Sequence, residues 1–192
     1  MDMMHFMWAP RLDKESGTYV FEIPLADGAI PMIALDDLGE YARWVFEHPS
    51  LASHLDELAI ATQHVHGEDI ARAFENFTGK KSFYRPVPLD AWMDAVVKEG
   101  ASSAYQVDPS EPGTLTWSTS FTGWWNLWRH SGGDNPVIAR DYSLLDEILP
   151  NRIRSIEEWM RRVGYTGELK MILKDREDKS GADRFKGRLT RE

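Results

Sequence analysis

The sequence predicts an α/β or α+β fold, in which a small sheet carries five or six packed helices. Three features lead to this prediction. Short runs of β-branched and aromatic residues, typical of strands, alternate with longer segments of helical periodicity. Turn residues such as Asp27-Gly28 separate these segments. Hydrophobic residues make up 42% of the 192-residue chain, which is enough to form a sizeable core.

Four apolar stretches stand out as strands or strand-like runs. TYVFEIPL (18–25) alternates aromatic and β-branched residues, and the apolar run AIPMIAL follows it after the Asp27-Gly28 turn. ELAIA (57–61) is short and apolar, as expected of a buried strand, and SFYRPVP (82–88) reads as a further strand.

Helical spacing marks the remaining segments. Residues 1–9 are expected to form a short helix that Pro10 terminates. A second helix follows Asp36 and Asp37, which are expected to cap it, and ends before Pro49. Its apolar positions are Leu38, Tyr41, Ala42, Val45 and Phe46. The further predicted helices are GEDIARAFENFTGKK (67–81), LDAWMDAVVKEG (89–100), a segment from about 119 to 129, YSLLDEIL (142–149) and SIEEWMRRVG (155–164). Gly79 is expected just past the end of the first of these, and the last is expected to open with a capping box, Ser155 and Glu158, and to close at Gly164.

Composition sets the class of protein. Residues 1–167 are expected to form one domain, and residues 168–192 a charged, flexible tail with few apolar residues. The net charge of −9 argues against nucleic-acid and anionic-membrane partners. No run is long enough to span a membrane, and the first residues lack the basic start of a secretory signal. With no cysteine in the chain, a cytoplasmic protein is the expectation.

Four segments, taken in order, resemble the C-terminal half of the NmrA-like family of atypical short-chain dehydrogenase/reductases. They are FMW (6–8), IPMIALDDLGEYARWVFEHPS (30–50), ELAIATQHVHGEDIARAFENFTGKK (57–81) and RSIEEWMRRVGY (154–165). The resemblance covers about residues 1–165 and rests on the order and spacing of these blocks. It implies a substrate-side domain related to NAD(P)-dependent oxidoreductases.

The dinucleotide-binding half of that family has no counterpart here. The 14 glycines include no G-x-G-x-x-G loop after a strand, and Ser131-Gly132-Gly133 follows a helix instead. No Tyr-x-x-x-Lys pair is present. We therefore expect no cofactor, with NADP or NAD bound only if a separate half supplies the site. An unpaired edge at ELAIA (57–61) would favour a homodimer.

The segment WSTSFTGWWNLWRHSGG (117–133) holds four tryptophans. On a helix, Trp124 and Trp128 are i, i+4 neighbours, and Trp125 lies on an adjacent line, so the indoles are expected to face more than one side. Either they fill a core, or one face lines a pocket. Under the second reading Trp117, Trp124, Trp125 and Trp128 bind a planar aromatic or polyketide-like molecule, because indoles stack on flat rings and donate N–H groups.

Histidines are the candidate acid–base groups. His130 ends the tryptophan helix, where the helix dipole favours a proton, and is the leading catalytic candidate. His5 is expected to face it across the pocket, with Asp108 and Tyr105 of an intervening loop as catalytic and binding partners. His64 and His66 lack a third ligand at a familiar spacing, so no metal site is expected. His66 falls at the start of a helix, where a capping role is the plainer reading.

Three functions remain open from the sequence. The first is an NmrA-like enzyme that isomerises, dehydrates or cyclises an aromatic metabolite without a cofactor. The second is an NAD(P)-dependent oxidoreductase half that needs a partner subunit or a missing N-terminus. The third is a binding or regulatory protein without catalysis.

Overall fold

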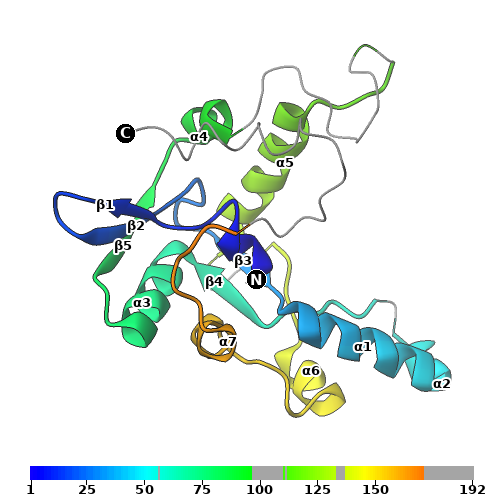
Figure 1. Ribbon diagram of the computed structural model, residues 1–192. Helices are drawn as coiled ribbons and strands as arrows, with labels where there is room; N and C mark the ends of the chain where they lie inside the picture. Colours follow the sequence, from blue (N-terminus) through cyan, green and yellow to red (C-terminus); the bar gives the residue numbers. More distant parts are fainter. Residues whose placement is uncertain (56, 97–109, 111, 133–136, 171–192) are drawn as a thin grey trace.

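The computed structural model describes residues 1–55, 57–96, 110, 112–132 and 137–170. The fold is mixed α/β, with two small sheets surrounded by helices, as predicted (Figure 1). Within these ranges the chain forms seven α-helices and five strands. A 3₁₀ helix, η1 (Asp2–His5), precedes them. No described helix has the length and apolarity that a membrane span requires.

The larger sheet has the order β1-β2-β5. Its strands are β1 (Arg11–Asp13), β2 (Thr18–Ile23) and β5 (Ser82–Pro86). β1 and β2 are antiparallel, whereas β2 and β5 are parallel, with Phe21 opposite Tyr84. The parallel pairing requires a crossover, and α3 (Gly67–Thr78) supplies the helix of that connection. The strands predicted at 18–25 and 82–88 are confirmed.

The smaller sheet pairs β3 (Ala29–Met32) with β4 (Gln63–His66) in antiparallel register. The prediction of a strand at ELAIA is wrong. Residues 57–61 form neither helix nor strand, and β4 begins two residues after them, at Gln63. Thr62 donates its N–H to the Met32 carbonyl, so pairing starts only there. The edge that was expected to drive dimerisation at ELAIA is therefore absent.

α3 packs its apolar face on the larger sheet and on α7 (Ile156–Val163). Phe74 is fully buried and contacts the rings of Tyr19, Phe21 and Tyr165. The ends of both helices follow the sequence prediction. Gly79 and Gly164 end α3 and α7 with positive φ angles of 69° and 65°. Ser155 accepts a hydrogen bond from the Glu158 N–H over 3.1 Å at the start of α7.

α1 (Leu35–Glu47) buries little of its apolar stripe. Of the five apolar positions named from the sequence only Tyr41 is buried, and its hydroxyl donates to the Leu145 carbonyl over 3.1 Å. Asp37 was predicted to cap the helix, but its carboxylate accepts the N–H of Ile153 at 2.9 Å instead. Burial raises the pKa of Asp37. α1 thus joins the body along one narrow line of residues, and α2 (Pro49–Ala52) extends it outward (Figure 1).

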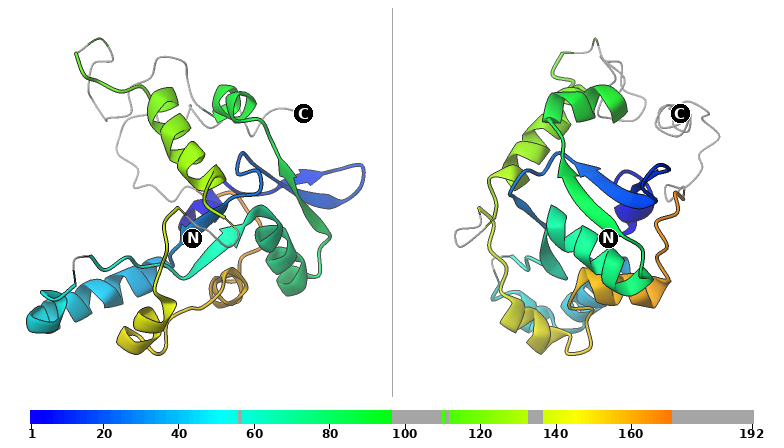
Figure 2. Two further views of the ribbon diagram at one scale, coloured as in Figure 1. Left: turned by 180° about the vertical axis from the view of Figure 1, so that it is seen from behind. Right: turned by 90° about the vertical axis from the view of Figure 1, so that its left-hand side faces the viewer.

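The remaining helices are α4 (Leu89–Val96), α5 (Trp117–Arg129) and α6 (Tyr142–Ile148). Figure 2 shows α4 and α5 together at one end of the molecule, with α6 and α7 at the other. Of the predicted tail, residues 171–192 lie outside the described part of the chain. The described start of the tail, up to Lys170, lies beside η1, because the Lys170 N–H donates to the His5 carbonyl over 2.7 Å.

Candidate functional site

The tryptophan helix α5 has well-defined ends. Thr116 caps it by accepting the Thr119 N–H at 3.1 Å. Its C-terminal end lies against the β2–β3 turn, where the Ala29 N–H donates to the Ser131 carbonyl. Both sides of this contact are glycines: a β-carbon at Gly28 would lie 2.0 Å from the Trp128 carbonyl oxygen, and one at Gly132 would lie 2.9 Å from that of Asp27. The turn therefore fixes where α5 ends.

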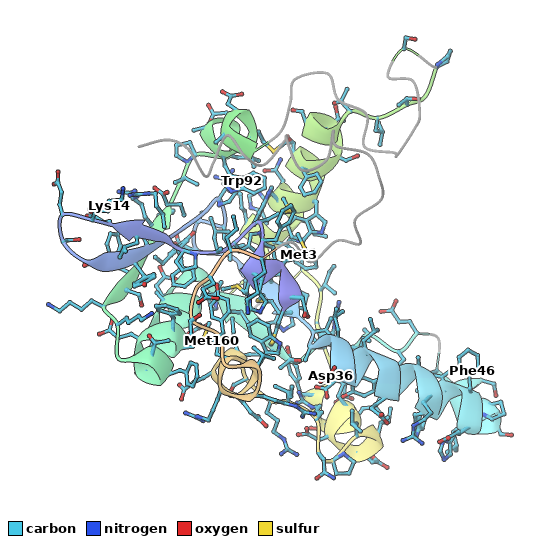
Figure 3. All side chains as sticks on the ribbon, viewed as in Figure 1. Met3, Lys14, Asp36, Phe46, Trp92 and Met160 are labelled. Carbon is cyan, nitrogen blue, oxygen red and sulfur yellow. The ribbon has the colours of Figure 1, made fainter. Side chains whose placement is uncertain are left out.

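Six aromatic side chains meet at this helix, and we call them the aromatic cluster. Trp124 and Trp125 lie 4.8 Å apart between ring centroids, and Trp124 and Trp128 lie 5.9 Å apart. Trp92 of α4, labelled in Figure 3, extends toward the body of the molecule. Its ring contacts that of Trp125 edge to face at 5.2 Å. The members are Trp8, Trp92, Phe121, Trp124, Trp125 and Trp128. Trp124, Trp125 and Trp128 project over an arc of about 100° around the helix, and side chains of this size still reach one another across it.

Burial divides the cluster. Trp125 is fully buried and Trp128 nearly so, at 0% and 8% exposure, whereas Trp124 is 37% exposed. Trp125 and Trp128 therefore belong to the core, which is the first of the two interpretations of this segment. Of the three, only Trp124 is substantially exposed to solvent. Trp117 opens α5, but its side chain lies outside the described residues, as do Tyr105 and Asp108.

Three buried indole nitrogens in the cluster have no hydrogen-bond partner in the described structure. They are the Nε1 atoms of Trp92, Trp125 and Trp128. Leaving a buried donor unpaired costs about 1–3 kcal/mol, and natural proteins satisfy most such groups.

A groove of about 520 Å³ runs between α4 and α5. Asp90 and Asp94 supply carboxylates from α4, and Arg129 supplies a guanidinium from α5 that forms no ion pair within the described residues. Trp125 lies one helical turn from Thr122 and from Arg129, both of which line the groove. The remaining lining residues are Pro88, Leu89, Met93 and Ser118. The aromatic cluster and the groove thus lie on different sides of the same pair of helices, α4 and α5.

The predicted histidine pair is not brought together in the described structure. His130 follows α5 as an exposed residue, and it does not line the groove. His5 is buried against α7, with its ring 5.7 Å from Trp159 and 5.0 Å from Tyr165. Burial is the main reason that the pKa of His5 is lowered. An acid–base function of either residue stays a prediction.

Sequence reasoning missed the partners of His64. Its Nδ1 lies 2.7 Å from the Tyr142 hydroxyl, and its Nε2 lies 3.1 Å from the Ile138 carbonyl. Because a carbonyl only accepts, Nε2 carries the proton and Tyr142 donates to Nδ1. No signal in the sequence pairs these residues, which are 78 positions apart. His66 directly precedes α3 and occupies its N-cap position. The Asp69 carboxylate accepts a hydrogen bond from the backbone N–H of His66 at 3.1 Å.

A second groove, of about 470 Å³, lies between α3 and β5. Its main polar groups already have partners. Arg72 pairs with Asp69, and the Tyr84 hydroxyl donates to the carbonyls of Ile23 and Ala26. It leaves fewer groups free for a ligand than the α4–α5 groove does.

Compared with known proteins, the chain matches no family model and no curated sequence.

Proposed function

We propose that the protein binds a planar aromatic small molecule in the α4–α5 groove, beside the aromatic cluster. The observation that carries the proposal is a groove of ligand size on the helix pair that bears the aromatic cluster, with the Arg129 guanidinium, which forms no ion pair within the described residues, in its lining. Small-molecule sites measure roughly 300–1,000 Å³, and this groove falls within that range at about 520 Å³. Trp124 offers partly exposed indole surface in the same cluster.

The groups around the groove favour a neutral ligand with both carbonyl and hydroxyl oxygens. The guanidinium of Arg129 seeks acceptors, such as the keto oxygens of a polyketide-like ring system. The carboxylates of Asp90 and Asp94 seek donors, such as phenolic hydroxyls. Two carboxylates against one guanidinium disfavour a phosphorylated ligand, because like charges repel.

The resemblance to the substrate half of NmrA-like proteins supports the same location, since the corresponding segment of that family lies over its substrate cleft. Binding is the function that this geometry supports best. The groove contains no histidine, so acid–base catalysis by His130 draws no support from it. We propose a binding or regulatory protein of NmrA-like origin, one that uses the groove without a nucleotide.

Calorimetric titration with 1,8-dihydroxyanthraquinone tests this function. We expect saturable binding of one molecule per chain. The variant Thr122→Phe places a ring in the groove and should weaken binding tenfold or more. Ser143→Phe, on the exposed side of α6, is the matched control and should bind as the wild type does. His130→Asn should bind equally well, because His130 does not line the groove.

Two results would contradict the proposal. One is a folded wild-type protein that binds neither this probe nor other hydroxylated polycyclic aromatics. The other is binding that Thr122→Phe leaves unchanged, which would place the site elsewhere on the molecule.

A further inference from the structure

Helix α1 carries three different surfaces. One line of residues, Asp37 and Tyr41, faces the body and is buried. A second line is charged. The third is apolar and spans an arc of about 120° on a helical projection. We call it the outer face of α1; its residues are Leu35, Leu38, Gly39, Ala42, Val45 and Phe46.

The outer face is exposed to an unusual degree. Phe46 is 84% exposed, Leu35 54% and Leu38 40%. Leu51 of α2 extends the apolar surface and is 57% exposed. Figures 1 and 2 show α1 and α2 projecting from the body as an arm, and Figure 3 places Phe46 near its outer end. Contiguous apolar surface of this kind marks an interaction site.

The charges beside this face are already compensated. Arg43 pairs with Glu40 at 2.7 Å and with Glu47 at 2.9 Å, both within the same helix. Asp36 lies 3.8 Å from Arg162 of α7. A partner therefore does not need to supply opposite charge, and an apolar helix is the surface that fits.

The order of side-chain sizes along the outer face is self-complementary. Small residues, Gly39 and Ala42, occupy its middle, and large ones, Leu35 and Phe46, occupy its ends. A two-fold axis between positions 40 and 41 places Gly39 against Ala42 of a second copy. The same axis places Leu35 against Phe46 of that copy. Close approach in the middle and interdigitation at both ends follow from one symmetric, antiparallel arrangement.

We propose that the outer face of α1 is a homodimer interface, in which the arms of two copies pack antiparallel. The large exposed side chains of the arm are Leu35, Leu38, Phe46 and Leu51. Their exposed fractions correspond to about 450 Å² of apolar surface per copy. Covering them in both copies buries about 900 Å², and the rim residues beside them bring the pair toward the roughly 1,200 Å² at which specific interfaces begin. We expect a weak dimer, with a dissociation constant in the micromolar range, because the interface lies at the small end of specific interfaces.

Sedimentation velocity between 1 and 100 μM tests the dimer. The wild-type chain of 22.0 kDa should shift to twice that mass as concentration rises. Phe46→Glu should remain monomeric at every concentration, with an unchanged far-ultraviolet circular dichroism spectrum. Phe83→Glu makes the same change at an exposed position of β5 and should still dimerise. A wild type that stays monomeric, or a Phe46→Glu variant that still dimerises, overturns the proposal.

Cross-linking tests the antiparallel register. The chain has no cysteine, so any disulfide that forms between introduced cysteines is intermolecular. Gly39 accepts a side chain, because a β-carbon there meets nothing within 4 Å. Copies with Gly39→Cys mixed with copies with Ala42→Cys should cross-link faster than either variant alone. Faster cross-linking of Gly39→Cys with itself would indicate parallel helices and would overturn the arrangement. Ligand binding at the α4–α5 groove should survive Phe46→Glu, so the two proposals fail independently.

Discussion

Gly28 and Trp128 approach so closely that a β-carbon on the glycine would lie 2.0 Å from the tryptophan carbonyl oxygen. The contact joins the β2–β3 turn to the last turn of α5. Both groups belong to the backbone, so neither can move aside as a flexible side chain would. The position of the tryptophan helix, and of every ring that it carries, thus depends on the absence of one methyl group.

Gly28→Ala should therefore destabilise the protein by more than about 2 kcal/mol, because α5 or the turn must shift. For a chain of this size the melting temperature should fall by roughly 5 °C or more. Gly123→Ala is the matched control in the same helix: its β-carbon meets nothing, and alanine favours helix by about 0.5–1 kcal/mol. Thermal unfolding of both variants checks the prediction. Equal melting temperatures would show that the contact relaxes without cost.

Trp125 and Trp124 are adjacent in sequence but should respond differently to truncation. Trp125→Ala removes a fully buried indole and should cost about 3–5 kcal/mol of unfolding free energy. Trp124→Ala removes a side chain that is 37% exposed, and it should cost clearly less. Urea denaturation of both variants gives the comparison. A larger loss of stability for Trp124→Ala would contradict the assignment of core and surface.

His64 should make the protein less stable in mild acid. Burial is the first cause that lowers the pKa of His64 in the folded state, whereas an unfolded histidine titrates near 6.5. Its contribution to stability is therefore complete above about pH 6.5 and is lost as the pH falls through the folded-state pKa. Melting temperatures at pH 7.5 and pH 5 measure this loss.

The variant His64→Gln retains an acceptor for the Tyr142 hydroxyl and a donor for the Ile138 carbonyl, but it does not titrate. It should reduce the fall in melting temperature without removing it, because the pKa of His5 is lowered as well. A variant that shows the full wild-type fall would exclude His64 as a source of the pH dependence.

NADPH and NADP should not bind to the isolated chain. The sequence contains no glycine-rich loop between a strand and a helix, which is the element that holds a pyrophosphate in dinucleotide-binding folds. Isothermal calorimetry at protein concentrations above and below dimerisation is the direct check. Tight binding at either concentration would show that the chain builds a nucleotide site that its sequence does not announce.

Local structure was the part that could be predicted from the sequence. Ser155 and Gly164 mark the two ends of α7, and Gly79 marks the end of α3, because caps depend on a few neighbouring residues. ELAIA was not predictable in the same way. Its composition suits a strand, but strand pairing depends on a partner, and β3 pairs with residues 63–66 instead.

The sequence by itself determined the mixed α/β class, the end of α3, both ends of α7 and the presence of an aromatic segment at 117–128. Spacing and capping are local properties, so they survive without knowledge of the fold. Tertiary structure alone decided that Trp125 is core while Trp124 is surface, that Tyr142 bonds His64, and that the apolar stripe of α1 faces outward. Each of these outcomes depends on contacts between residues far apart in the chain, and periodicity shows that a helix has an apolar face but not what covers it.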